Sequence, residues 1–187
     1  VLLADGGGTD LSDWVNTASY PNLDLTYINY GKDTCTHDFM VKMNSACSVI
    51  TTPFTVMVDN DDMIDVNGFI EGIEFLSSNN DYASYRGNVL SGGSAIYTQP
   101  GNSDEQPIDR FRFPNGGFNS GWHDIVKTHT LKTFFEIMDK SNTNDLQLVF
   151  TVNRYWHTLF GKSHKDNSVP YYYHRQGSSL VYGKGLY

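Results

Sequence analysis

A short apolar run that ends in a dense group of carboxylates lies near the middle of the first half of this chain. Residues 54–58 have the sequence Phe-Thr-Val-Met-Val, and the next four residues are Asp59, Asn60, Asp61 and Asp62. A run of this length that is rich in β-branched residues predicts a buried strand. Neighbouring carboxylates repel one another, so this group favours a bound cation. The carboxyl end of a strand is also where open α/β sheets bind their ligands.

Oxygen donors on adjacent residues suit Mg²⁺ or Mn²⁺, particularly where a diphosphate supplies the remaining ligands. The sequence therefore predicts a site for one of these ions at residues 59–62. The alternative interpretation is a solvated acidic turn that precedes the next helix, and the residues alone leave it open.

A calcium-binding loop is a third interpretation of the same region. Several of residues 63–74 fall on ligand or turn positions of an EF-hand loop, namely Asp65, Asn67, Gly68 and Glu74. The first ligand position holds Met63, whose side chain does not bind a hard cation. The segment before it is predicted to be a strand, whereas an EF-hand has a helix there, so we favour the cation site at the strand end.

Composition excludes several classes of protein. The 187 residues suffice for one domain with a sizeable core. A net charge of −8 argues against a nucleic-acid backbone as the main partner. No apolar segment has membrane-spanning length, and no signal peptide is recognisable. Cys35 and Cys47 form neither a redox motif nor a zinc motif, and they suit a reducing compartment, so we expect a cytoplasmic protein.

Hydrophobic spacing along the first 78 residues predicts alternating strands and helices. Strands are expected at residues 1–4, 23–30 and 54–58, and helices at residues 11–19, 37–50 and from 66 onward. Asp10 and Asp65 are expected to cap two of these helices. This order predicts an α/β fold with a mostly parallel sheet flanked by helices.

The remaining segments are assigned in the same way. Strands are expected at residues 81–85, 95–98 and 169–175, and helices at residues 124–139 and 145–160. The irregular stretch 99–121 carries aromatic residues, and a loop of this length favours a binding lid over a linker.

A glycine-rich turn, Asp-Gly-Gly-Gly-Thr-Asp, occupies residues 5–10 after the first predicted strand. Glycine lets a backbone approach a ligand closely, and a strand followed by glycines and a helix is a place where nucleotides bind. The segment is not a P-loop, because the Gly-Lys-Ser/Thr ending is absent. A plain turn explains this segment equally well.

The order of these motifs resembles that of family-2-like glycosyltransferases of the GT-A (nucleotide-diphospho-sugar transferase) fold. Residues 1–10 are similar to the family's Val-Asp-Asp-Gly-Ser-Thr-Asp stretch after its second strand. Residues 42–44 sit where the family often has Ala-Arg-Asn on a helix, and residues 58–62 match its Asp-x-Asp motif. Residues 173–179 are similar to its C-terminal Tyr-Arg-x-His-x-x-Ser segment. The resemblance covers most of the chain.

The chain departs from the family pattern in two places. It opens directly on the apolar segment 1–4 and lacks the family's first strand, so we expect the natural N-terminus to lie upstream. His174 precedes Arg175 instead of following it, and Gly177 stands where the family's histidine would be. His174 is nevertheless a candidate metal ligand.

The resemblance implies a metal-dependent glycosyltransferase that moves a sugar from a nucleotide diphosphate sugar, with a UDP-sugar as the expected donor. Residues 1–98 would be the nucleotide-binding half of a single domain, and residues 99–187 the acceptor-side half. Mn²⁺ or Mg²⁺ would bridge the diphosphate and neutralise the leaving group. The acceptor would be a carbohydrate or a lipid-linked molecule, and we expect the transfer to invert the anomeric configuration.

The resemblance also assigns residues on the donor side. Asp5 would contact the base, with Gly6 beside it allowing close approach of the backbone. Lys42 would place a positive charge near the phosphates, although an exposed helix lysine is an equally good interpretation.

The acidic motif would bind both nucleotide and metal. Asp59 and Asn60 would contact the nucleotide. Asp59, Asp61 and Asp62 would hold the cation, with His174 as a further candidate ligand.

An inverting transfer needs a general base that takes the proton of the acceptor hydroxyl. The family often places an acidic pair before a late helix, and Asn144-Asp145 occupies the comparable position, so Asp145 is the first candidate. Asp124, which follows Trp122-His123, is the second. Either carboxylate could instead stabilise the start of a helix through the helix dipole.

Three other functions stay open at this point. A sugar-nucleotide binding module that has lost catalysis is credible because the first strand is missing. A nucleotidyltransferase can share the fold and the paired aspartates. A calcium-binding protein that uses residues 63–74 is the least favoured.

Overall fold

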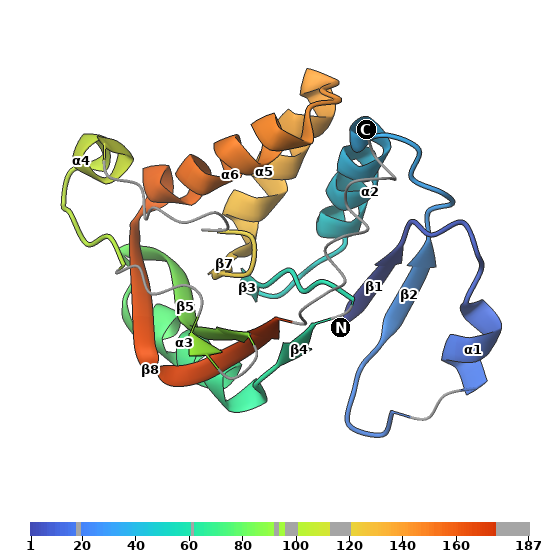
Figure 1. Ribbon diagram of the computed structural model, residues 1–187, viewed down its shortest axis with the longest axis horizontal. Coiled ribbons are helices and arrows are strands. Elements are labelled where there is room, and N and C mark those ends of the chain that lie inside the picture. Colours follow the sequence, from blue (N-terminus) through green and yellow to red (C-terminus); the bar gives the residue numbers. More distant parts are fainter. Residues whose placement is uncertain (18–19, 61, 92–93, 96–100, 113–120, 175–187) are drawn as a thin grey trace.

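Two β-sheets and the helices packed against them make up the structure (Figure 1). The computed structural model describes residues 1–17, 20–60, 62–91, 94–95, 101–112 and 121–174.

A parallel pair of strands forms the first sheet. β1 (Leu2–Asp5) pairs with β2 (Thr26–Asn29), and α1 (Ser12–Thr17) lies on the connection between them. The Asp10 carboxylate accepts a hydrogen bond of 2.9 Å from the backbone N–H of Ser12, as expected for a residue that caps this helix. The predicted β-α-β order of this part of the chain is confirmed.

A mixed sheet forms the centre of the molecule. Its strands are β3 (Phe54–Thr55), β4 (Met63–Ile64), β5 (Tyr82–Ser91), β6 (Ser94–Ala95), β7 (Ile125–Lys127) and β8 (Lys162–His174). They lie in the order β3-β7-β5-β8-β4, with β6 beside β5. β5 and β8 are parallel, whereas β7 is antiparallel to both β3 and β5, and β4 is antiparallel to β8.

The α/β class is therefore confirmed, but the sheet is mixed and not mostly parallel. The reason is β7. A helix was expected to begin at residue 124, but residues 125–127 form a strand that inserts between β3 and β5.

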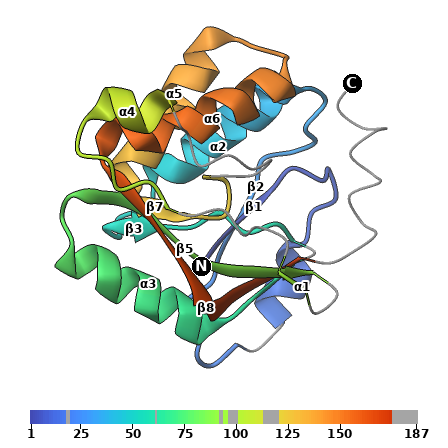
Figure 2. The same cartoon turned by 60° about the vertical axis from the view of Figure 1, so that its left-hand side comes forward.

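Helices cover both faces of the mixed sheet. Figure 2 shows α2 (Thr36–Ser48), α5 (Thr128–Ser141) and α6 (Leu146–Phe160) on one side and α3 (Val66–Ser78) on the other. α4 (Pro107–Arg112) lies beside α6, within the segment that was expected to be irregular. No helix in the described part of the chain is both long enough and apolar enough to span a bilayer.

Two buried clusters stabilise this arrangement. The first, on the side of α2, α5 and α6, contains Met40, Phe134, Phe135 and Val149, all fully buried. The second, on the side of α3, contains side chains of α3, β5, β7 and β8, namely Phe69, Leu76, Tyr85, Val89, Ile125 and Tyr171. Val126 belongs to the first cluster, so two adjacent residues of β7 point to opposite faces, as in any strand.

The structure shifts several predicted boundaries. The helices expected at 37–50 and 145–160 are confirmed as α2 and α6. The strand expected at 54–58 is reduced to β3, because only Phe54 and Thr55 find partners on the short strand β7. The last strand begins earlier than expected, at Lys162, because β8 already pairs with β5 there, with Lys162 opposite Tyr82.

Asp65 caps α3 as predicted. Its carboxylate accepts hydrogen bonds from the backbone N–H groups of Asn67 (3.0 Å) and Gly68 (3.4 Å). Residues 63–64 are in β4 and residues 66–78 are helical, so the segment does not form an EF-hand loop. The calcium-loop interpretation is therefore wrong.

α3 packs very closely on β8 at Gly68. A Cβ at this position would overlap the carbonyl oxygen of Pro170 and would lie 3.0 Å from the Cα of Tyr171. Both are backbone atoms of a strand, so neither can rotate away as a flexible side chain would.

We expect Gly68→Ala to lower the free energy of unfolding by about 1–3 kcal/mol, the usual cost of overpacking. Helix propensity alone predicts the opposite sign, because alanine is favoured over glycine by about 1 kcal/mol in a helix interior. Urea denaturation measures the difference. Ser78→Ala, at an exposed position of the same helix, is the control and should change stability by less than about 0.5 kcal/mol. A Gly68→Ala protein as stable as the wild type would contradict the close packing.

Candidate functional site

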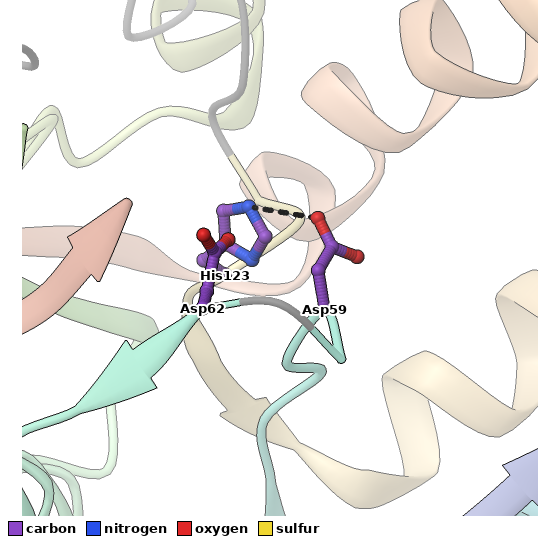
Figure 3. Close-up of side chains that lie close together, drawn as sticks. All are labelled: Asp59, Asp62 and His123. Carbon is purple, nitrogen blue, oxygen red and sulfur yellow. Dashed lines mark ion pairs between the residues drawn. The ribbon is translucent and has the colours of Figure 1, made fainter. Parts of the chain in front are cut away.

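The acidic segment after β3 meets the turn before β7. Asp59, Asp62 and His123 each offer one ligand atom, and these atoms lie within 4.8 Å of one another (Figure 3). Nε2 of His123 is 3.8 Å from Oδ2 of Asp59. Both carboxylates are half-buried, and His123 is only 4% exposed. We call these three residues the Asp59/Asp62/His123 cluster.

The pairing of two strands explains this meeting. β3 and β7 are antiparallel, with Thr55 opposite Val126. Residues that follow β3 and residues that precede β7 therefore lie at the same edge of the sheet. The backbone N–H of Asp62 donates to the carbonyl of Asp59 (3.3 Å), which closes the acidic turn and brings its two carboxylates to one place.

Backbone contacts fix the position of His123. Its Nδ1 lies 3.4 Å from the carbonyl oxygen of Met57, on the segment that leads to Asp59. The hydroxyl of Tyr171, a fully buried residue of β8, donates a hydrogen bond to the carbonyl oxygen of His123. These contacts orient Nε2 toward the carboxylates.

Burial lowers the pKa of His123 below its usual value, and the nearby Asp59 carboxylate and Met57 carbonyl offset this only in part. The imidazole is therefore neutral at physiological pH, which is the form that binds metal ions. Two carboxylates and one neutral imidazole nitrogen are donors that suit a first-row divalent cation. The residues present thus fit a divalent metal ion.

The predicted metal ligands are placed as follows. Asp59 and Asp62 are in the cluster. Asp61 lies outside the described residues, as does the side chain of His174 at the end of β8. His123 was not predicted as a ligand. A strand prediction at 125–127, supported by the β-branched pair Ile125 and Val126, would have placed His123 at the sheet edge.

The two candidate bases lie at opposite ends of α5. Asp124 directly follows His123 and is buried. Asp145 caps α6, where its carboxylate accepts a hydrogen bond of 3.0 Å from the N–H of Leu148. α5 has 14 residues, a length of about 21 Å, and Figure 1 shows its junction with α6 at the end remote from β7. The structure thus brings Asp124, and not Asp145, beside the cluster.

Asp124 belongs to a buried group of charges. Nε of Arg86 is 3.5 Å from Oδ1 of Asp124, and both side chains are buried. Arg86 on β5 is paired in register with Lys165 on β8. Burial and the positive charge of Arg86 lower the pKa of Lys165 to about 8, against the opposing effect of Asp124. The carboxylate of Asp124 is thus held in a cationic environment.

The residues predicted on the donor side gather at the carboxyl end of β1. Asp5 accepts hydrogen bonds of 2.8 Å from the N–H of Gly7 and from the hydroxyl of Tyr27. Lys42 of α2 is buried in an ion pair with Asp33. A Cβ at Gly6 would overlap the side-chain ends of both members of this pair, so a larger residue there would displace them.

Lys42 is therefore not an exposed helix lysine. The site residue that sequence reasoning missed on this side is Asp33, which lies in the turn after β2 and carries no recognisable motif. Asn60 is exposed in the turn between Asp59 and Asp62.

An open groove of about 600 Å³ lies away from these residues. Its lining consists of Ile50, Thr51, Thr52, Pro53, Phe54, Lys127, Thr128, His129 and Lys132. The two lysines already donate to backbone carbonyls, Lys127 to Asn80 (2.6 Å) and Lys132 to Ser48 (3.1 Å). Since none of the predicted site residues lines this groove, we give it no part in the site.

Crystal structures of TarS from S. aureus share this fold. A structure of TarS residues 1–349 in complex with UDP-GlcNAc superposes with a TM-score of 0.64 at 14% identity, covering 95% of this chain and 49% of that one. The same TarS fragment in a second structure gives a TM-score of 0.65 at 15% identity, covering 93% and 50%. The complex of this fragment with UDP superposes with a TM-score of 0.58 at 12% identity, covering 97% of this chain and 52% of that one.

This chain spans about half of that TarS fragment, and 32% of the chain in a longer TarS structure. No family model and no curated protein sequence matches it. At these identities the comparisons establish the fold, and at that level they confirm the resemblance to family 2 glycosyltransferases of GT-A type.

Replacing Arg86 would remove the positive charge that is paired with the buried Asp124 carboxylate. We expect Arg86→Met to lower the free energy of unfolding by about 3 kcal/mol, typical of breaking a buried ion pair. The double variant Arg86→Met/Asp124→Leu should recover part of that loss, because it leaves no isolated carboxylate. Chemical denaturation of the four proteins in this cycle gives the coupling energy. If the double variant loses as much free energy of unfolding as the two single variants together, the pair does not stabilise the fold.

Proposed function

We propose that this chain is part of a metal-dependent glycosyltransferase that uses a nucleotide diphosphate sugar, with a UDP-sugar as the expected donor. One observation carries the proposal: Asp59, the first aspartate of the Asp-x-Asp motif, and the nearby Asp62 converge with the buried imidazole of His123 at one edge of the central sheet. The fold in which they do so is shared with a protein crystallised with UDP and with UDP-GlcNAc.

The Asp59/Asp62/His123 cluster would hold the cation, and Asp61 and His174 remain candidate ligands. A divalent cation bound there would supply Lewis-acid stabilisation of the charge on the departing diphosphate. The chain's own contribution is to hold its donors in place through the closed acidic turn and the contact between His123 and Met57.

Residues 1–98 would bind the nucleotide. Asp5 would present its carboxylate to the base, in an orientation fixed by Gly7 and Tyr27. Gly6 lets the backbone pass close to the Lys42–Asp33 pair, and Lys42, held by Asp33, would place a positive charge near the phosphates. Asn60, exposed in the acidic turn, would contact the nucleotide together with Asp59.

Residues 99–187 would bind the acceptor, a carbohydrate or a lipid-linked molecule. We propose Asp124 as the general base of an inverting transfer, because a base has to lie within hydrogen-bond reach of the reacting hydroxyl. Asp124 adjoins the cluster in sequence and is buried beside Arg86, which would keep its carboxylate oriented. Asp145 is remote from the cluster and already serves as a helix cap.

Calorimetric titration of UDP, with and without Mn²⁺, tests the donor site. We expect wild-type binding to weaken at least about tenfold without Mn²⁺, equivalent to about 1.4 kcal/mol. Asp62→Asn should weaken it similarly in the presence of Mn²⁺. Asp145→Asn is the matched control, because asparagine also caps helices, and it should bind UDP like the wild type. If neither UDP nor any other nucleoside diphosphate binds under either condition, the transferase proposal is rejected.

Release of UDP from UDP-GlcNAc in water tests the base. We expect Asp124→Asn to lower kcat by about 10²–10⁴-fold, the usual contribution of a positioned base, while UDP affinity stays within about threefold. Asp145→Asn should retain full activity. The reverse pattern would transfer the role to Asp145. Release of the nucleoside monophosphate would identify a nucleotidyltransferase, and UDP binding without turnover of any UDP-sugar would identify a binding module.

A further inference from the structure

We infer that His123 is a direct metal ligand whose imidazole makes this site select Co²⁺, Zn²⁺ and Mn²⁺ over Mg²⁺ and Ca²⁺, and that the ion binds before any nucleotide. This inference deepens the proposed function and relies on it only in placing a cation at the Asp59/Asp62/His123 cluster.

The orientation of the ring is the first argument. In metal sites, a histidine that donates one ring N–H to a backbone carbonyl presents the lone pair of its other nitrogen to the metal. Nδ1 of His123 faces the carbonyl of Met57 at 3.4 Å, and Nε2 faces Asp59 (Figure 3). The ring is thus oriented as a metal ligand would be.

The spacing of the donors is the second argument. Nε2 of His123 and Oδ2 of Asp59 are 3.8 Å apart, too far for a direct hydrogen bond. Bonds from nitrogen and oxygen donors to a first-row divalent ion are about 2.0–2.2 Å long, so one ion fits between two atoms at this separation. The ligand atoms of Asp59, Asp62 and His123 all lie within 4.8 Å of one another, so the Asp62 carboxylate is the third protein donor to such an ion.

The rigidity of the site is the third argument. His123 is 4% exposed, and Tyr171, which anchors its backbone, is fully buried. The structure therefore orders the imidazole before a ligand arrives. A site with only one or two carboxylates depends on substrate phosphates to complete its coordination, whereas a site with two carboxylates and an ordered imidazole can hold an ion without nucleotide.

The nitrogen donor determines the selectivity. Mg²⁺ and Ca²⁺ prefer oxygen ligands, and Mg²⁺ gives up its waters reluctantly. Imidazole favours the later first-row ions, whose affinities rise from Mn²⁺ to Co²⁺. We therefore expect Co²⁺ to bind more tightly than Mn²⁺, and Mn²⁺ to bind at least about tenfold more tightly than Mg²⁺.

Pulsed electron paramagnetic resonance of the Mn²⁺-loaded protein, without nucleotide, tests this directly. We expect the echo envelope to be modulated by one ¹⁴N nucleus of a coordinated imidazole. His123→Asn should abolish the modulation and weaken Mn²⁺ binding at least about tenfold, with a smaller effect on Mg²⁺. His129→Asn is the matched control, because His129 is an exposed histidine of α5, and it should leave the spectrum unchanged.

The outcomes separate this inference from the proposed function. Mn²⁺ bound without ¹⁴N modulation, or bound only after UDP is added, overturns the inference and leaves the transferase proposal intact. If the protein binds Mn²⁺ through a histidine nitrogen but binds no nucleoside diphosphate, the inference holds and the transferase proposal is rejected. Because His174 is also a candidate ligand, a substitution at His123 is needed to assign the nitrogen, and His123→Gln provides a second variant if His123→Asn fails to fold.

Discussion

The antiparallel pairing of β3 with β7 is the interaction on which the rest of the structure depends. It consists of few residues, Phe54 and Thr55 opposite Val126 and Lys127, yet it joins segments that are far apart in the chain. It places the acidic turn beside His123, and it sends Ile125 and Val126 into the two hydrophobic clusters. The position of the site and the packing of both faces of the sheet thus follow from one short strand.

Local patterns predicted the helices well because their causes are local. The spacing of apolar residues located α2, α3 and α6, and Asp65 was a reliable cap because its carboxylate bonds to N–H groups two and three residues away. Strand partners depend on distant residues, so the parallel sheet inferred from element order was only partly right. His123 escaped prediction for the same reason: nothing near it in sequence shows that a carboxylate turn lies against it.

The two general-base candidates show how a correct local argument can mislead. Asp145 does what an acidic residue at a helix start is expected to do, and it accepts a backbone N–H there. For Asp124 the same role was the alternative interpretation, but the segment after it is a strand, so its carboxylate lies instead among the charged side chains Arg86 and Lys165. Burying charges is costly, and they persist in pairs or groups. The charges of Asp124, Arg86 and Lys165 are held close together next to the Asp59/Asp62/His123 cluster. Charges on the surface of the protein are instead solvated.

The cluster also bears on the division of the chain into a nucleotide half and an acceptor half. Asp59 and Asp62 come from the first, and His123 comes from the second. An ion held by all three would join the halves as a cross-link does and would close a long loop of the chain. Once the site is largely occupied, the free energy of unfolding would rise with the logarithm of the ion concentration. The halves would then not be separable modules. The concentration of available metal ion would affect the stability of the folded protein as well as its activity.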